Sequence, residues 1–121
     1  MEPLTRNEIG LFDINFETGE CYWSHEFREM LGVSTAIPAE FHLLLGQIHP
    51  DDRREFGRFA MEPFRPDCPP NSAREFRVVY SDGREQWLHI ERRAILGGSE
   101  VTRLVGFAFA IGAPMRLQHA A

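Results

Sequence analysis

A predicted β-hairpin in the C-terminal half constrains the fold of this chain more than any other feature. The pair Asp82-Gly83 lies between two strand-like runs, Arg74–Tyr80 and Glu85–Leu96, and Trp87 follows shortly after it. An Asp-Gly pair between alternating runs is the strongest short-range hairpin signal, because a two-residue turn needs positive φ at both central positions. We therefore expect two antiparallel strands joined by a tight two-residue turn.

Strand patterns also begin and end the chain. Ile9–Phe16 and Glu20–Trp23 are separated by a turn and form a second predicted hairpin. The last predicted strand, Val101–Ile111, is apolar on both faces, which is typical of a central strand whose outer side is covered. Its two faces are Val105, Phe107, Phe109 and Ile111, and Leu104, Gly106, Ala108 and Ala110.

Three short helices are predicted between the two hairpins. Ser24 is a suitable N-cap for the first helix, and Gly32 is a suitable residue to end it. The second helix is expected to open near Pro38, because proline suits the first helical position. The third begins at His49-Pro50-Asp51-Asp52, where the aspartates complement the helix dipole. A proline-rich loop, residues 65–73, then leads to the second hairpin.

The apolar stripes of these helices supply the candidate binding residues. They recur at helical spacing and are expected to face the sheet. Two interpretations stay open: a close-packed core, or a pocket for a small apolar or aromatic ligand. The residues are Phe27, Met30, Leu31, Phe41, Leu44, Ile48, Phe56 and Phe59.

Bulk composition limits the function classes. The length of 121 residues fits one domain, and a net charge of −5 argues against nucleic acid and an anionic membrane surface as partners. Cys21 and Cys68 match no zinc or redox spacing and suit a reducing compartment. No apolar run is long enough to span a membrane, and the N-terminus is not a signal peptide. A cytoplasmic location is expected.

No pattern in the sequence indicates catalysis. The segment His49-Pro50-Asp51-Asp52 could form a metal or acid–base site, but helix initiation explains it better. No nucleophile motif or phosphate-binding loop is present, so we expect no catalytic, cofactor-binding or metal-binding residues. A small α+β enzyme would need a buried acid or base among Asp13, His42 and His89.

Charged residues alternate on the two strands of the second hairpin. Glu75 and Arg77 lie on the first of these strands, and Glu91 and Arg93 lie on the second. They could hold an anionic ligand, but cross-strand ion pairs on the exposed face of the sheet are the favoured interpretation.

The element order predicts an α+β fold with an antiparallel sheet and helices on one face. This order resembles the PAS domain family, in particular the subgroup of bacterial sensor kinases and cyclic-dinucleotide signalling proteins. Ile48-His49-Pro50-Asp51-Asp52-Arg53 matches that subgroup's element residue for residue. Further matches are Thr18-Gly19, Tyr22-Trp23-Ser24, Leu31-Gly32, Glu75-Phe76-Arg77, Asp82-Gly83, Gln86-Trp87 and Leu104-Val105-Gly106.

The resemblance implies a five-stranded antiparallel sheet of order 2-1-5-4-3 with three or more short helices on one face. It places the domain at residues 9–111, between an N-terminal linker or cap (1–8) and a C-terminal linker (112–121). The chain departs from the family where Ala110-Ile111-Gly112 replaces the usual Asp-Ile-Thr, Gln86 replaces Arg, and Phe12 and Ile14 replace Trp.

Cofactor-binding members of the superfamily have signatures that this chain lacks. Flavin-binding light sensors carry an Asn-Cys-Arg-Phe-Leu-Gln motif, which is absent here. Haem sensors use a histidine on the long helix, and residues 50–64 contain none. We therefore expect neither flavin nor haem.

The resemblance implies a sensory and dimerisation module of a bacterial signalling protein, with a sensor histidine kinase as the first expectation. A ligand or partner would change helix–sheet packing. Expected partners are a second copy, bound through the outer sheet face and the N-terminal segment, a downstream output domain and a small apolar ligand. The alternative is a ligand-free interaction domain of a diguanylate cyclase, a phosphodiesterase or a regulator.

Overall fold

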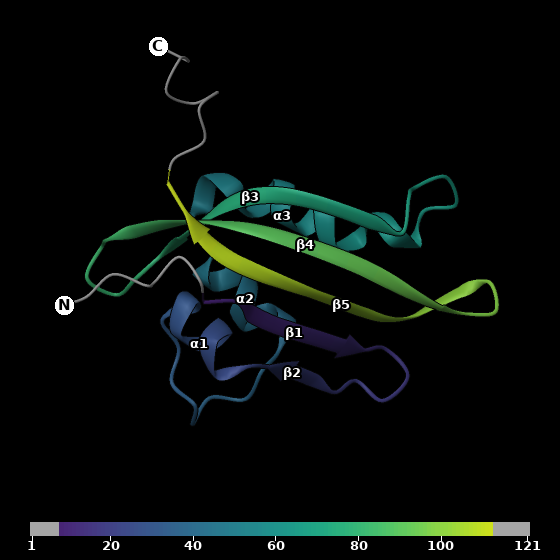
Figure 1. Ribbon diagram of the computed structural model, residues 1–121, viewed down its shortest axis with the longest axis horizontal. Coiled ribbons are helices and arrows are strands. Elements are labelled where there is room, and N and C mark those ends of the chain that lie inside the picture. The colour runs from purple at the N-terminus through teal and green to yellow at the C-terminus, as the bar shows by residue number, and fades with distance from the viewer. Residues whose placement is uncertain (1–7, 113–121) are drawn as a thin grey trace, which may run out of the picture.

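The computed structural model describes residues 8–112, which form a five-stranded antiparallel sheet covered by helices on one face (Figure 1). The strand order is β2-β1-β5-β4-β3, as the resemblance to the PAS family implies. The expected linker residues 1–7 and 113–121 lie outside the described part. The strands are β1 (Gly10–Asn15), β2 (Cys21–Trp23), β3 (Asn71–Val79), β4 (Glu85–Gly97) and β5 (Glu100–Ile111).

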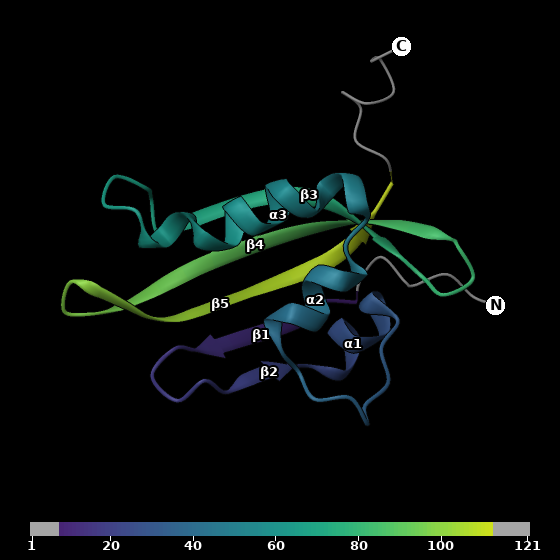
Figure 2. The same cartoon turned by 180° about the vertical axis from the view of Figure 1, so that it is seen from behind.

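All three α-helices lie on the same side of the sheet (Figure 2). We call this side the inner face and the opposite side the outer face. A 3-10 turn precedes α3 and another follows it. The helices are α1 (His25–Leu31), α2 (Phe41–Gln47) and α3 (Arg53–Met61), and the 3-10 turns are η1 (Pro50–Asp52) and η2 (Glu62–Phe64).

Strand β5 lies in the middle of the sheet, between β1 and β4. Its inner-face residues Leu104 and Ala108 are buried under the helices, while Val105 and Phe107 on the outer face are only half-buried. The two-sided apolar pattern therefore predicts its place correctly.

A glycine on β5 allows the first strand to pack closely. A Cβ at Gly106 would overlap both the backbone carbonyl oxygen of Glu91 and Cζ of Phe12, whose ring occupies that side of the strand. Phe12 is buried and its ring centroid is 5.4 Å from that of Phe27 on α1. The missing side chain thus makes room for an aromatic contact between sheet and helix.

The ends of α1 follow the sequence prediction. The Ser24 hydroxyl accepts hydrogen bonds from the backbone N–H of Phe27 and of Leu11, at 3.2 and 2.8 Å, so one buried side chain caps α1 and ties it to β1. Gly32 ends the helix with φ 74°, where a Cβ would meet the Tyr80 ring at 2.7 Å.

Two predicted boundaries are wrong. The second helix begins at Phe41 rather than near Pro38, because Arg28 donates hydrogen bonds to the carbonyl oxygens of Ser34 and Ile37 and holds that segment as a turn.

The other boundary concerns the loop at residues 65–73. Strand β3 begins within it, at Asn71. The carbonyl of Pro70 accepts hydrogen bonds from the Ala94 N–H and from Arg92, and these bonds place the chain beside β4.

The predicted turn type is also wrong. Gly83 has φ 89°, but no non-glycine residue in the range 8–112 has positive φ, so Asp82 does not. The Gly83 N–H donates to the Tyr80 carbonyl, and the Tyr80 N–H donates to the Arg84 carbonyl, both at 2.9 Å. The hairpin therefore has a three-residue loop ending in a left-handed glycine, because one glycine satisfies that loop type without strain at Asp82.

Candidate functional site

The eight candidate binding residues all lie between the helices and the inner face of the sheet. Seven are buried, and Phe41 is half-buried against them. Five of them surround one small cavity, whereas Met30, Leu31 and Ile48 pack in the surrounding core. The five are Phe27, Phe41, Leu44, Phe56 and Phe59.

Aromatic rings fill most of this space. The ring of Phe56 contacts those of Phe76 and Phe41, with centroids 5.0 and 6.0 Å apart. The remaining cavity has a volume of about 20 Å³, enough for roughly one water molecule. A larger ligand would have to displace rings before it could bind.

The cavity wall contains a buried cation that the sequence interpretation missed. Arg92 on β4 is 2% exposed. Its guanidinium donates to the carbonyl oxygens of Phe59 and Pro70, both at 2.9 Å, and to the Glu62 carboxylate at 3.0 Å. Burial lowers the pKa of Arg92, although Glu62 acts in the opposite direction. The two-residue alternation of a β-strand could have identified Arg92 as an inner-face residue, because it follows the buried Ile90 by two positions.

The predicted helix-initiation segment before α3 joins the helices to the edge of the sheet. The imidazole Nδ1 of His49 accepts the Asp51 N–H at 3.0 Å, which caps η1. The backbone N–H of His49 donates to the Arg77 carbonyl on β3 at 2.8 Å. The Asp52 carboxylate binds both the backbone N–H and the guanidinium of Arg77. These contacts favour the structural interpretation of the segment.

At this junction, Asp52 and Arg77 each shift the pKa of the other. Burial raises the pKa of Asp52, but hydrogen bonds from Arg77 and its positive charge offset this, so the pKa lies below its ordinary value. The side-chain hydrogen bond to Asp52 in turn raises the pKa of Arg77. Both groups therefore stay ionised near neutral pH.

The outer face carries polar side-chain contacts, but their partners differ from those expected. His89 lies between two carboxylates, with Nδ1 2.7 Å from Glu75 and Nε2 3.0 Å from Glu91. Arg77 pairs with Asp52 instead of a glutamate on the hairpin. The register explains this, because Glu75 lies opposite His89 and Arg77 lies opposite Trp87.

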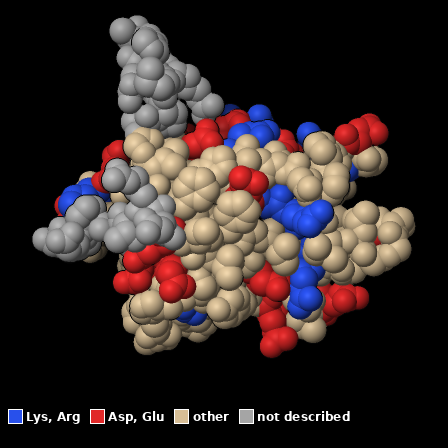
Figure 3. Space-filling view, viewed as in Figure 1, with Lys and Arg blue, Asp and Glu red and all other residues tan. Residues whose placement is uncertain are grey.

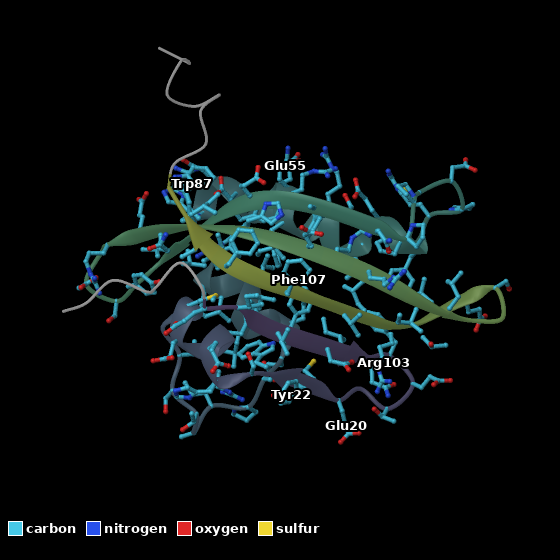
Figure 4. The ribbon with its side chains drawn as sticks, viewed as in Figure 1. Glu20, Tyr22, Glu55, Trp87, Arg103 and Phe107 are labelled. Atoms are coloured by element: carbon cyan, nitrogen blue, oxygen red, sulfur yellow. The ribbon has the colours of Figure 1, made fainter. Side chains whose placement is uncertain are left out.

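Residues other than Lys, Arg, Asp and Glu cover much of the same outer face (Figure 3). Phe107 lies in the middle of it, and Trp87 lies near the end of β5 (Figure 4). A shallow groove of about 600 Å³ runs beside Leu11, Tyr22 and Phe107. We call Leu11, Tyr22, Val105, Phe107 and Phe109 the outer-face patch.

The candidate acids and bases of an enzyme are not buried. Asp13 pairs with Arg103 at 2.9 Å, His42 is exposed on α2, and His89 is half-buried on the outer face. Among residues 8–112, no three His, Cys, Asp or Glu side chains are grouped to hold a metal ion. Both cysteines are free thiols, and burial raises the pKa of Cys21.

The C-terminal end of β5 is tied to β4 by a side chain. The Gln86 amide donates to the carbonyl oxygens of Ile111 and Trp87, both at 3.0 Å. Gln86 is one of the positions at which the chain departs from the family pattern. Its amide fixes the last residue of the sheet.

No family model and no curated protein sequence matches the chain. Solved structures do match. The N-terminal domain of a diguanylate cyclase with a PAS/PAC sensor from Marinobacter aquaeolei is 20% identical, with a TM-score of 0.72 over 93% of this chain and 99% of that chain. A sensory box histidine kinase/response regulator from Burkholderia thailandensis is 28% identical, with a TM-score of 0.67 over 93% and 83%.

The LOV domain of a blue-light activated histidine kinase from Erythrobacter litoralis is 16% identical, with a TM-score of 0.60 over 88% of this chain and 99% of that chain. The chain therefore has the PAS fold, and its structural neighbours include PAS and LOV domains of histidine kinases and a diguanylate cyclase.

Within the described residues, no helix is long and apolar enough to cross a membrane.

Proposed function

We propose that this domain is the sensory and dimerisation module of a bacterial signal-transduction protein, with a sensor histidine kinase as the first assignment. The observation that carries the proposal is the complete PAS sheet, in which β5 is central and ends beside Trp87. Similarity to domains of kinases and a cyclase supports it. The domain itself performs no chemistry, and its location is cytoplasmic. The chain's motifs also favour the His-Pro-Asp-Asp-Arg subgroup.

The proposed mechanism is a change in helix–sheet packing. A small apolar ligand entering between Phe27, Phe56 and Phe59 would move the helices against the sheet, and a downstream output domain would receive the change. A ligand shifts such an equilibrium only by its difference in affinity for the two states. Native mass spectrometry of the purified protein tests this, because a retained small molecule supports ligand sensing.

The outer-face patch is the proposed dimer surface, extended by the N-terminal segment. Leu11 is 49% exposed and Tyr22 is 59% exposed, so the patch leaves apolar area in water. Phe107→Glu is expected to shift sedimentation toward monomer, whereas His42→Glu on the exposed face of α2 is not. Wild-type protein that is monomeric at high micromolar concentration contradicts this proposal.

The sensory assignment is tested in the full-length protein. Substitution of Phe107 by Glu is expected to change the output activity, and His42→Glu is expected to leave it unaltered. Equal activities in the wild type, in Phe107→Glu and in a variant lacking residues 8–112 would refute a signalling role for the domain.

The small cavity favours a second candidate, a ligand-free interaction domain of a diguanylate cyclase, a phosphodiesterase or a regulator. A space of about 20 Å³ holds no metabolite without rearrangement. This candidate predicts that no molecule is retained in native mass spectrometry. A visible absorption spectrum separates both candidates from a flavin or haem sensor, and we expect no band beyond the protein's own.

A further inference from the structure

The C-terminal end of β5 is held by a strand on one side only. Pairing with β1 reaches Ala108, which lies opposite Gly10, whereas pairing with β4 continues to Ile111, opposite Trp87. Residues 109–111 therefore have β4 as their single strand partner within the described part of the chain. A strand end of this kind opens at lower free energy than a strand paired on both sides.

Side chains of β4 supply the additional hold on this end. The Gln86 amide donates to the Ile111 carbonyl at 3.0 Å. Trp87 occupies the outer face directly opposite Ile111 (Figure 4). The position of Trp87 therefore bears on whether residues 109–111 remain paired.

Trp87 is connected in turn to the start of α3. Its ring lies under the Arg77 guanidinium, whose central carbon is 5.2 Å from the ring centroid. Arg77 is fixed by Asp52, with guanidinium nitrogens 2.7 and 3.0 Å from the carboxylate oxygens. Asp52 immediately precedes α3.

The segment around Asp52 is also bound to the preceding helix. Arg53 donates from Nε to the Ile48 carbonyl at 2.9 Å and from a terminal nitrogen to the Gly46 carbonyl at 3.1 Å. A displacement of α2 or α3 would therefore move the carboxylate that holds Arg77.

We propose that Asp52, Arg77, Trp87 and Ile111, here named the relay row, couple the start of α3 to the pairing of residues 109–111. When the Asp52–Arg77 contact breaks, Arg77 leaves the Trp87 ring, and β4 holds the end of β5 less firmly. The row is a conformational device with a closed arrangement, in which the contacts are made, and an open one. Its meaning as a signalling step rests on the proposed function, but the coupling does not.

Amide hydrogen exchange measured by NMR tests the coupling. Asp52→Asn keeps the shape of the side chain and removes its charge. We expect it to speed exchange of the amides of residues 109–111 about tenfold, because a hydrogen bond to a charged group is worth roughly that factor or more. The amides of residues 101–104, at the other end of β5, are expected to change much less.

A matched control separates this effect from a general loss of stability. Glu62→Gln weakens the buried pair with Arg92, which lies away from the Trp87 end of β4. At an equal loss of global stability, Glu62→Gln should not speed amide exchange at residues 109–111 more than at residues 101–104. If both variants speed those amides equally relative to residues 101–104, the relay row is refuted.

A double substitution tests the route. In a Trp87→Leu background, Asp52→Asn should no longer change exchange at residues 109–111. Arg77→Lys gives the same test in a protein that keeps Trp87, because a lysine keeps the charge and loses the planar, forked group. An undiminished effect of Asp52→Asn in either background overturns the proposal. Loss of coupling would leave the sensory assignment standing, since that depends on output activity in the full-length protein.

Discussion

The Asp52 carboxylate accepts three hydrogen bonds from Arg77, at 2.7, 2.9 and 3.0 Å. One comes from the backbone N–H and two come from the guanidinium. Asp52 belongs to η1, whereas Arg77 lies on β3 at the edge of the sheet. The pair therefore fastens the helical layer to an edge strand.

Substitution of Asp52 by Asn should lower the free energy of unfolding by about 2 kcal/mol at pH 7, because charge-assisted hydrogen bonds are replaced by weaker ones. Urea denaturation followed by tryptophan fluorescence measures the change. Asp51→Asn is the matched control, since the Asp51 side chain is 77% exposed. Equal stabilities of the two variants would show that the Arg77 contact contributes little.

The Asp52–Arg77 pair also predicts how the free energy of unfolding changes at acidic pH. Burial raises the pKa of Asp52, but the hydrogen bonds and charge of Arg77 together lower it by more, so the folded-state pKa lies below the unfolded-state value of about 4. The stabilisation is therefore complete above about pH 4 and is lost as the pH falls through the folded-state pKa. The difference in unfolding free energy between wild type and Asp52→Asn should be constant from pH 6 to 8 and shrink below pH 4. A difference that is as large at pH 2 as at pH 7 contradicts the assignment.

Two neighbouring arginines should respond very differently to the same substitution. Arg92→Met should destabilise the protein by about 3 kcal/mol, because it leaves Glu62 and the Phe59 carbonyl without their buried donor. Arg93→Met, on the exposed outer face, should change stability by no more than about 0.5 kcal/mol. Thermal or urea unfolding compares the two, and similar losses would mean that Arg92 is not an anchor.

Alanine should have opposite effects at two glycines. Gly57 lies inside α3 with nothing within 4 Å of an added Cβ, so Gly57→Ala should stabilise the protein by about 0.5–1 kcal/mol. At Gly106 the added Cβ would overlap the Glu91 carbonyl oxygen on β4 and the Phe12 ring, so Gly106→Ala should cost about 1–3 kcal/mol. Melting temperatures that shift in the same direction for both variants would contradict this account.

Sequence patterns predict the layers of this fold well, because strand alternation and helix caps are local. The two apolar faces of β5 correctly predict its central position, and Ser24 and Gly32 correctly predict the ends of α1. The loop between β3 and β4 was harder, since Asp82-Gly83 fits more than one turn type. The backbone hydrogen bonds of Tyr80 and the absence of a positive φ at Asp82 distinguish them.

The contacts of the site were less predictable because they join residues distant in the chain. The motif around Asp52 explains the turn before α3, but its partner Arg77 lies 25 residues further on. Arg92 follows the inner-face alternation of β4, yet its partner Glu62 comes from η2. Such pairings depend on how the helices sit on the sheet.

Because aromatic rings fill the inner cavity, the affinity for any ligand that enters it would depend on how the core packs. The proposed apolar ligand would bind only molecules in which Phe56 and its neighbours have already moved apart. Its observed dissociation constant is then the intrinsic constant divided by the fraction of opened molecules, so an opened fraction of about 1% weakens binding about 100-fold. If the domain senses such a ligand, as proposed, core substitutions that change this fraction would alter the concentration at which it responds, without touching any atom that contacts the ligand.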